Sequence, residues 1–189
     1  MPFNLDPKKT ALVVIDLQHG IVGLPVQPHS AEAVLNGGRR MAEAFRKRSA
    51  TVVYVRVDLR NMLPLMVDIS HVDPNAEPAA PIASELVPDA GFQQGDLLIT
   101  KRHWGAFGHT ELEAILAGLG IETIVLGGIA TNFGVESTAR QAASLGFHVV
   151  IAEDACSSID TNAHQFAVET ILPLIGRVKN TDEIIHALS

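Results

Sequence analysis

Short apolar runs alternate with longer amphipathic stretches along the chain. Continuous runs of β-branched and aliphatic residues predict strands that are buried on both faces, as in parallel sheets. We expect such strands at 11–15, 51–57, 97–100, 123–126 and 148–152, with a short edge strand at 177–178. Apolar residues that recur at helical spacing predict helices at 30–48, 111–119, 135–145, 163–174 and 182–188.

This alternation predicts a three-layer α/β/α fold of the Rossmann-like type, with helices on both faces of a parallel sheet. The runs at 11–15 and 123–126 are the most uniformly apolar, so we expect them at the centre of the sheet. The direction of winding then reverses between them, and ligands of such sheets bind at that point, beyond the carboxyl ends of the strands. Asp16 and the segment 127–134 fall there.

One segment breaks the alternation. Residues 58–95 contain five prolines and no regular apolar pattern. An irregular segment of this length is usually functional or mobile rather than a passive connection. A chain of 189 residues is of ordinary size for one domain. We therefore expect a single domain, 1–189, in which 58–95 is a lid or an oligomer contact.

Composition narrows the class of protein. Hydrophobic residues make up 47% and charged residues 19% of the chain, which excludes intrinsic disorder. A net charge of −7 argues against non-specific binding to nucleic acid or anionic membranes. The single cysteine excludes an internal disulfide and a multi-cysteine metal site. The chain begins without a signal-peptide pattern and has no apolar run near the roughly 20 residues of a membrane span, so we expect a cytoplasmic protein.

Two charged residues follow predicted strands. Asp16 stands at the rim of a buried strand, where it is either a functional acid or a satisfied strand-end group. Gln18 would point to the same side as Asp16 in an extended chain. Lys101 follows the strand at 97–100 and could hold a neighbouring carboxylate in its ionised form. A surface lysine is the commoner alternative.

In the segment 127–134 (GGIATNFG), glycines and other small residues stand directly before a predicted helix. Its backbone N–H groups could bind an anion or a developing oxyanion, or the segment could be only a tight turn. It is neither a dinucleotide fingerprint nor a phosphate-binding loop, and no G-x-S-x-G elbow occurs in the chain.

The histidines and the cysteine offer no sequence motif for chemistry. No histidine pair has metal-ligand spacing, so we expect neither a metal nor a cofactor. His19 and His103 are the two histidines that could approach the site, and the others are expected to be structural or at the surface. Cys156, which is expected just past the fifth strand, is interpreted as a small buried packing residue.

Taken together, four segments resemble the isochorismatase-like hydrolase family, also called the cysteine hydrolase superfamily. They are 11–18 (ALVVIDLQ), 101–107 (KRHWGAF), 128–140 (GIATNFGVESTAR) and 150–157 (VIAEDACS). The resemblance implies a six-stranded parallel sheet and an active site of Asp, Lys and Cys. Asp16 and Lys101 match the first two residues, whereas Gly134 stands where many relatives have the cysteine.

This departure changes the implied chemistry. A glycine supplies no thiolate, so the thioester route of the amidase members is excluded, and Cys156 follows a different strand. Isochorismatases proper are similar in having glycine at this position, and they cleave a vinyl ether without a covalent enzyme intermediate. Asp16 would then protonate the terminal vinyl carbon, and Lys101 would orient Asp16 and tune its pKa. The resemblance further implies a non-proline cis peptide, by position Ile129–Ala130, and N–H groups of 130–134 that hold a substrate oxygen.

We therefore expect a hydrolase that acts on a small carboxylate-bearing substrate and forms a homo-oligomer, with no nucleic-acid or membrane partner. The resemblance places the substrate-binding residues beside the catalytic set of Asp16, Lys101 and Gly134. These are Gln18, Trp104, Phe107, Ile129, Ala130, Thr131 and Phe133. Arg56 and Arg102 could recognise the carboxylate. Nicotinamidase activity is disfavoured, because 57–61 (VDLRN) lacks the histidine of the Asp-x-His metal motif.

Two alternatives belong to other classes of protein. The first is a catalytically silent protein of the same fold that binds a small molecule, although keeping both Asp16 and Lys101 argues against it. The second is a flavodoxin-like nucleotide binder, which the lack of a phosphate-binding glycine motif disfavours.

Overall fold

The computed structural model describes residues 3–70 and 77–189. Six parallel strands form one sheet in the order β3-β2-β1-β4-β5-β6. The strands are β1 (Thr10–Ile15), β2 (Thr51–Val57), β3 (Leu97–Lys101), β4 (Thr123–Ile129), β5 (His148–Ser157) and β6 (Arg177–Lys179). The predicted α/β fold is confirmed, and β1 and β4 are the two central strands.

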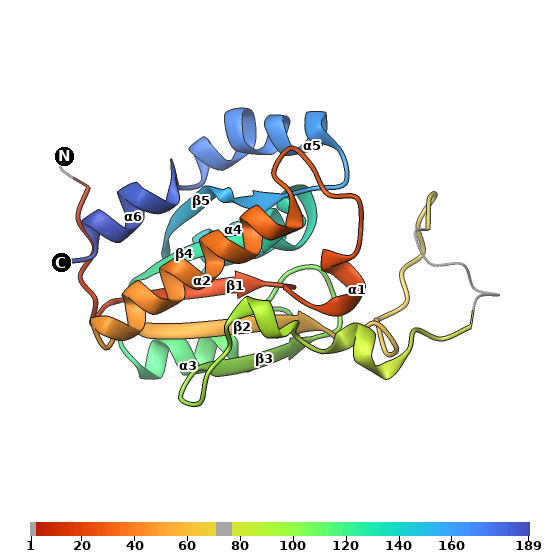
Figure 1. The fold of residues 1–189 in the computed structure, drawn as a ribbon, viewed down its shortest axis with the longest axis horizontal. Coiled ribbons are helices and arrows are strands. Elements are labelled where there is room, and N and C mark those ends of the chain that lie inside the picture. Colours follow the sequence, from red (N-terminus) through yellow and green to blue (C-terminus); the bar gives the residue numbers. More distant parts are fainter. Residues whose placement is uncertain (1–2, 71–76) are drawn as a thin grey trace.

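Helices cover both faces of the sheet (Figure 1). On one face, α2 (Ala31–Lys47) and α6 (Thr181–Ala187) share a buried apolar cluster with Leu12 and Val14 of β1. On the other face, α3 (Leu112–Gly118) and α4 (Glu136–Ser144) share a second cluster with Val13 and Ile15. This second cluster also includes residues of the turns η4 (Ala167–Ile171) and η5 (Leu172–Leu174), which continue α5 (Thr161–Phe166). The strands are therefore buried on both sides, which is why their sequences are apolar without alternation.

Most predicted elements are found within a few residues of their expected bounds, and β2 matches its prediction at both ends. Two strands extend well beyond their predicted ends. β4 continues through Gly127 to Ile129, and β5 continues beyond Ala152 to Ser157. Cys156 therefore lies inside β5, where it pairs with Gly128, and the prediction that it lies past the strand is wrong. Four short elements were not predicted: α1 (His19–Val22), the 3₁₀ turns η1 (Pro81–Ser84) and η2 (Pro88–Ala90), and the π-helical turn η3 (Thr131–Val135).

Two backbone features bring the ends of β1 and β4 together. Asp16 has a φ of 54°, so the chain turns sharply as soon as β1 ends. Gly128 has a φ of 127°, and a β-carbon there would lie 2.1 Å from the carbonyl oxygen of Ile15. Only glycine allows this approach of the two backbones. The peptide bond between Ile129 and Ala130 is cis, as expected from the resemblance.

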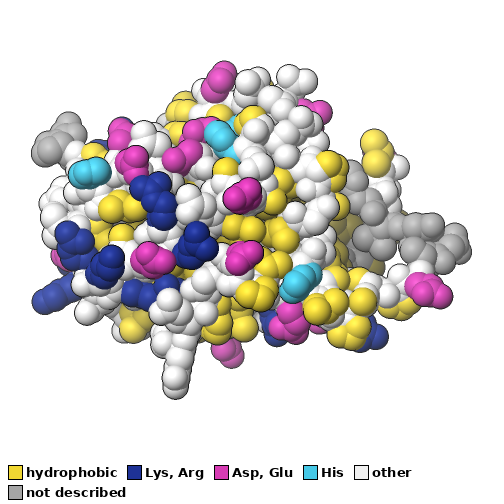
Figure 2. Space-filling model, in the orientation of Figure 1, with side chains coloured by type: hydrophobic (Ala, Val, Ile, Leu, Met, Phe, Trp, Pro, Cys, Tyr) yellow, Lys and Arg dark blue, Asp and Glu magenta, His cyan; other side chains and the backbone are white. Residues whose placement is uncertain are grey.

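The described residues 58–70 and 77–84 extend beyond the carboxyl ends of the strands (Figure 1), whereas η2 lies against α2. The described part of 58–95 exposes several large apolar side chains, among them Leu65, Met66 and Ile69. Figure 2 shows Lys and Arg side chains gathered over α2, while hydrophobic side chains become frequent toward residues 58–70 and 77–84. Part of the predicted lid, residues 71–76, lies outside the described residues. Within 3–70 and 77–189, no helix has the length and apolar character needed to cross a membrane.

Candidate active site

Asp16 and Lys101 meet at the carboxyl ends of the central strands. Asp16 directly follows β1. Lys101 is the last residue of β3 and pairs with Val57 at the end of β2. The long lysine side chain reaches past β2, and its Nζ lies 2.7 Å from Oδ2 of Asp16. Nζ also donates a hydrogen bond to the carbonyl oxygen of Trp104, at 2.7 Å. With side chains only 2% and 7% exposed, Lys101 and Asp16 form a buried ion pair.

The second carboxylate oxygen of Asp16 makes no such contact. Oδ1 is buried and has no hydrogen-bond partner in the described part of the chain. Burial raises the pKa of Asp16 from 3.8 to about 6, although the charge and hydrogen bond of Lys101 act to lower it. A carboxyl group with this pKa is partly protonated near neutral pH, so it can serve as a general acid or base.

Gly134 lies directly beside this ion pair. It belongs to η3 (Thr131–Val135), a single π-helical turn between β4 and α4. A β-carbon at this position would lie 3.2 Å from Oδ2 of Asp16 and 3.3 Å from Nζ of Lys101. Any side chain here would point at the two charged groups. Glycine instead leaves that space open.

A cavity of about 490 Å³ opens over these residues. Among the described residues that line it, only Asp16, Lys101 and His103 carry ionisable side chains. Trp104 and Phe133 stack edge to face in its wall, with ring centroids 5.1 Å apart. The remaining lining residues are Ile21, Leu24, Pro25, Val57, Leu59, Met62, Ile129, Ala130, Gly134 and Ile159. A small apolar molecule with one or two polar groups fits such a lining.

The structure brings together most of the residues expected at the site. The cavity is lined by Asp16, Lys101, Gly134, Trp104, Ile129, Ala130 and Phe133, whereas Gln18, Phe107 and Thr131 are not among its lining residues.

Gln18 braces the backbone behind the cavity. Its side-chain amide donates to the carbonyl oxygens of Val57 and Ala83, each at 3.0 Å. Its Oε1 accepts from the N–H of Val57 at 2.7 Å. The expectation that Gln18 faces the same side as Asp16 assumed an extended chain, and the positive φ of Asp16 breaks that assumption.

Phe107 and Thr131 are also directed elsewhere. Phe107 packs against Phe147 in the core, with ring centroids 5.8 Å apart. Thr131 is fully buried, and its Oγ1 lies 2.8 Å from Nδ1 of His164.

The arginines considered for carboxylate recognition do not line the cavity either. Arg56 is paired with Glu85, and Arg102 donates to the carbonyl oxygen of Asn61. Of the two histidines expected near the site, His103 lines the cavity and His19 does not. Cys156 is also absent from the lining, and burial raises the pKa of its thiol far above the ordinary range.

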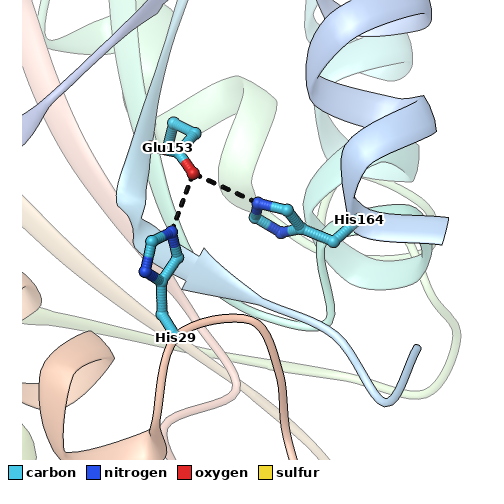
Figure 3. Close-up of side chains that lie close together, drawn as sticks. All are labelled: His29, Glu153 and His164. Carbon is cyan, nitrogen blue, oxygen red and sulfur yellow. Dashed lines mark hydrogen bonds and ion pairs between the residues drawn. The ribbon is translucent and has the colours of Figure 1, made fainter. Parts of the chain in front are cut away.

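One polar cluster was not found from the sequence. His29, Glu153 and His164 come together beside the second half of β5 (Figure 3). Oε1 of Glu153 lies 2.7 Å from Nε2 of His29 and 3.2 Å from Nε2 of His164. Burial acts to raise the pKa of Glu153, but the hydrogen bonds from both histidines outweigh it and lower that pKa. Burial also lowers the pKa of His164. No short sequence spacing links these positions, so no motif could have indicated them.

Comparison with known proteins gives a consistent result over the whole chain. The profile of the isochorismatase domain matches residues 10–183. The uncharacterized isochorismatase family protein YecD of Escherichia coli O157:H7 is 43% identical over 197 aligned residues, which cover 98% of this chain and 99% of YecD.

Two further comparisons concern structure and activity. The solved structure of an isochorismatase family protein from Burkholderia thailandensis superposes with a TM-score of 0.90 at 40% identity, covering 98% of this chain and 97% of that one. The ureidoacrylate amidohydrolase RutB of Klebsiella pneumoniae subsp. pneumoniae is 36% identical over 106 residues, which cover 56% of this chain and 45% of RutB.

Proposed function

The chain belongs to the isochorismatase family of hydrolases, and from this premise we propose that it cleaves a vinyl-ether-type bond in a small carboxylate-bearing molecule by acid–base catalysis. Asp16 is the acid, Lys101 is its partner, and no covalent enzyme intermediate forms. The observation that carries the proposal is the open space at Gly134. It lies at the contact point of a buried ion pair, where the family resemblance places a cysteine nucleophile.

The cavity lining supports a water nucleophile. Among the described residues that line it, none is a serine, threonine, cysteine or tyrosine. The thioester route that the resemblance gives to amidase members needs an activated thiolate. Cys156 is fully buried and is not among those lining residues. Amide hydrolysis like that named for RutB is therefore the less suitable chemistry for this site.

The environment of Asp16 suits proton transfer to carbon. Burial raises the pKa of Asp16 to about 6, so part of the protein has a protonated carboxyl group near neutral pH, and the unpartnered Oδ1 can carry that proton. Protonation of the terminal vinyl carbon turns the ether carbon into an oxocarbenium-like centre. The ammonium group of Lys101, 2.7 Å away, stabilises the carboxylate that remains. Water then adds to the cationic centre, its proton returns to Asp16, and the hemiketal collapses to pyruvate and an alcohol.

The lining also bears on the substrate. The apolar walls accommodate a hydrocarbon skeleton, and Lys101 and His103 are the basic side chains that a substrate carboxylate could contact among the described lining residues. Arg56 and Arg102, which are engaged elsewhere, are not required for this arrangement.

We also propose that the segment 58–95 completes the cavity as a lid and takes part in a homo-oligomer of a cytoplasmic enzyme. Leu59 and Met62 from this segment line the cavity, which supports the lid. Exposed apolar side chains farther along it, including Leu65 and Ile69, are suited to contact with a second copy. Light scattering of the purified chain, compared with a Leu65→Ser, Ile69→Ser variant, tests the oligomer. A monomeric native chain would contradict it.

The test of the activity is pyruvate release from isochorismate by the native chain, Asp16→Asn and Lys101→Met, with Asp6→Asn as the matched control at an exposed aspartate outside the cavity and the segment 58–95. Loss of a general acid is expected to lower turnover by about 10²- to 10⁴-fold in Asp16→Asn, while Asp6→Asn keeps the native rate. Release that survives in Asp16→Asn would refute its role. Hydrolysis of an amide panel without pyruvate release would refute the vinyl-ether chemistry. Binding without turnover would support the silent binding protein instead.

A further inference from the structure

Three side chains with metal-binding atoms converge outside the cavity lining (Figure 3). His29 comes from the loop before α2, Glu153 from β5 and His164 from α5. One ligand atom from each lies within 4.8 Å of the other two. We propose that these three residues bind a divalent transition-metal ion of the zinc type. This site is separate from Asp16 and Lys101, and the proposal does not depend on the hydrolytic activity.

The spacing of the ligand atoms suits a metal at their centre. Two ligands of a tetrahedral zinc ion, each about 2.0–2.1 Å from the metal, are about 3.3 Å apart. Here Oε1 of Glu153 lies 2.7 Å and 3.2 Å from the two imidazole nitrogens. The carboxylate therefore needs to move away from His29 by only about half an ångström to reach the tetrahedral spacing. Without a metal, the same oxygen accepts a hydrogen bond from each ring.

The backbone that carries the ligands is held in place by other contacts. The carbonyl oxygen of His29 accepts a hydrogen bond from Ser157 Oγ at 2.7 Å. Gln27 and Ser158 pair through two backbone hydrogen bonds of 2.6 Å and 2.9 Å, which tie the same loop to the end of β5. His164 is only 1% exposed, so its ring position is fixed by packing. The site is thus largely preformed by the fold.

Thr131 supplies the outer contact that metal-bound histidines commonly have. Its Oγ1 lies 2.8 Å from Nδ1 of His164, on the opposite side of the ring from Glu153. When Nε2 coordinates a metal, Nδ1 carries the proton and donates it to this hydroxyl group. Such a contact fixes both the tautomer and the orientation of the ligand.

The donor set selects the class of metal. Two imidazole nitrogens and one carboxylate oxygen suit Zn²⁺ and neighbouring transition metals, whereas Ca²⁺ and Mg²⁺ prefer sites made of oxygen ligands. The side chains of His29 and Glu153 are 30% and 34% exposed. Solvent can therefore reach the centre of the cluster, and water can occupy the remaining coordination position.

The experiment is calorimetric titration of the tag-free, chelator-treated chain with Zn²⁺, and separately with Mg²⁺. Co²⁺ serves as a spectroscopic probe, since its visible d–d bands report the coordination geometry. The variants are His29→Ala and Glu153→Gln, whose side chains are part-exposed, and Thr131→Val. The matched control is His148→Ala, an exposed histidine at the opposite end of β5. Circular dichroism confirms that each variant is folded.

We expect the native chain and His148→Ala to bind one Zn²⁺ and to give the visible bands of tetrahedral Co²⁺. Neither should show binding of Mg²⁺. Thr131→Val is expected to weaken Zn²⁺ binding by about 10- to 100-fold, as for other outer contacts, and loss of a direct ligand should weaken it at least as much. No Zn²⁺ binding by the folded native chain would overturn the proposal. Binding that survives in both His29→Ala and Glu153→Gln, or that is lost in His148→Ala, would overturn it as well.

Discussion

Replacing Gly134 with alanine places a methyl group against the buried ion pair. The new β-carbon would lie 3.0 Å from Ile15 Cγ2, 3.2 Å from Asp16 Oδ2 and 3.3 Å from Lys101 Nζ. Favourable contacts between heavy atoms lie at about 3.5–4.0 Å, so these neighbours must retreat by a few tenths of an ångström. All three are buried, so the movement is resisted by the packing around them.

Two opposing terms set the effect of Gly134→Ala on stability. Overpacking a filled site costs about 1–3 kcal/mol. The backbone at Gly134 is outside the left-handed region, so alanine also recovers about 0.4–1 kcal/mol by restricting the unfolded chain. We therefore expect a net loss of about 0–2.6 kcal/mol in the free energy of unfolding. Displacement of Asp16 should also lower kcat/KM by about tenfold or more, since an error of about 1 Å can cost 10²-fold.

Urea unfolding and pyruvate release measure the two effects. Gly118→Ala is the matched control, because Gly118 lies in α3 and an added β-carbon there would meet nothing within 4 Å. We expect this control to be stabilised by a few tenths of a kcal/mol to about 1 kcal/mol and to keep the native turnover. The reasoning is refuted if Gly134→Ala matches Gly118→Ala in both stability and turnover.

Three further predictions concern proton transfer, the space beside Gly134 and the brace behind the cavity. As pH rises through about 6, kcat/KM should fall, because burial raises the pKa of Asp16 to that value and only the protonated form donates; a rate that increases through this range contradicts the role of the acid. Gly134→Cys should give a thiol whose pKa is below the ordinary value of about 8.5, since it would lie beside the ammonium group of Lys101. Alkylation rates against pH measure this, with buried Cys156 as the slow internal reference, and a pKa of about 8.5 or higher counts against the placement. Gln18→Leu leaves three backbone groups without their side-chain partner and should cost about 2 kcal/mol or more in denaturant unfolding; a loss below about 0.5 kcal/mol would show that the brace is unnecessary.

Most of the fold could be predicted from the sequence because a strand buried on both faces must be apolar along its length. That requirement is sufficient to locate β2 at both ends and to place β1 and β4 at the centre. The second half of β5 could not be predicted, since Glu153 and Asp154 interrupt the apolar pattern. The helix α1 has only four residues, too few to show a helical period.

The site was predictable where position along a strand decides it and not where side-chain direction does. Asp16 directly follows β1 and Lys101 is the last residue of β3, and parallel strands bring their carboxyl ends to one edge. The direction of Gln18 depends on one positive φ at Asp16. Likewise, the partner of Phe107 in the core is Phe147, which lies in a distant part of the sequence.

The cluster of His29, Glu153 and His164 could not be predicted either, because its members are far apart in the sequence. Its members belong to a loop, a strand and a helix, and only the folded sheet brings them within 4.8 Å of one another. Sequence spacing finds metal ligands when they share one element, as in an H-x-x-x-H helix. It cannot find ligands whose proximity is a product of topology.

The most direct test of the proposed chemistry is the turnover of isochorismate in D₂O, with early-time mass spectrometry of the pyruvate formed. Transfer of a deuteron from Asp16 to the terminal vinyl carbon predicts one deuterium in the methyl group of pyruvate, and Asp16→Asn should form no product above background. Pyruvate without this deuterium, or labelled pyruvate formed at the native rate by Asp16→Asn, would contradict the assignment of Asp16 as the acid.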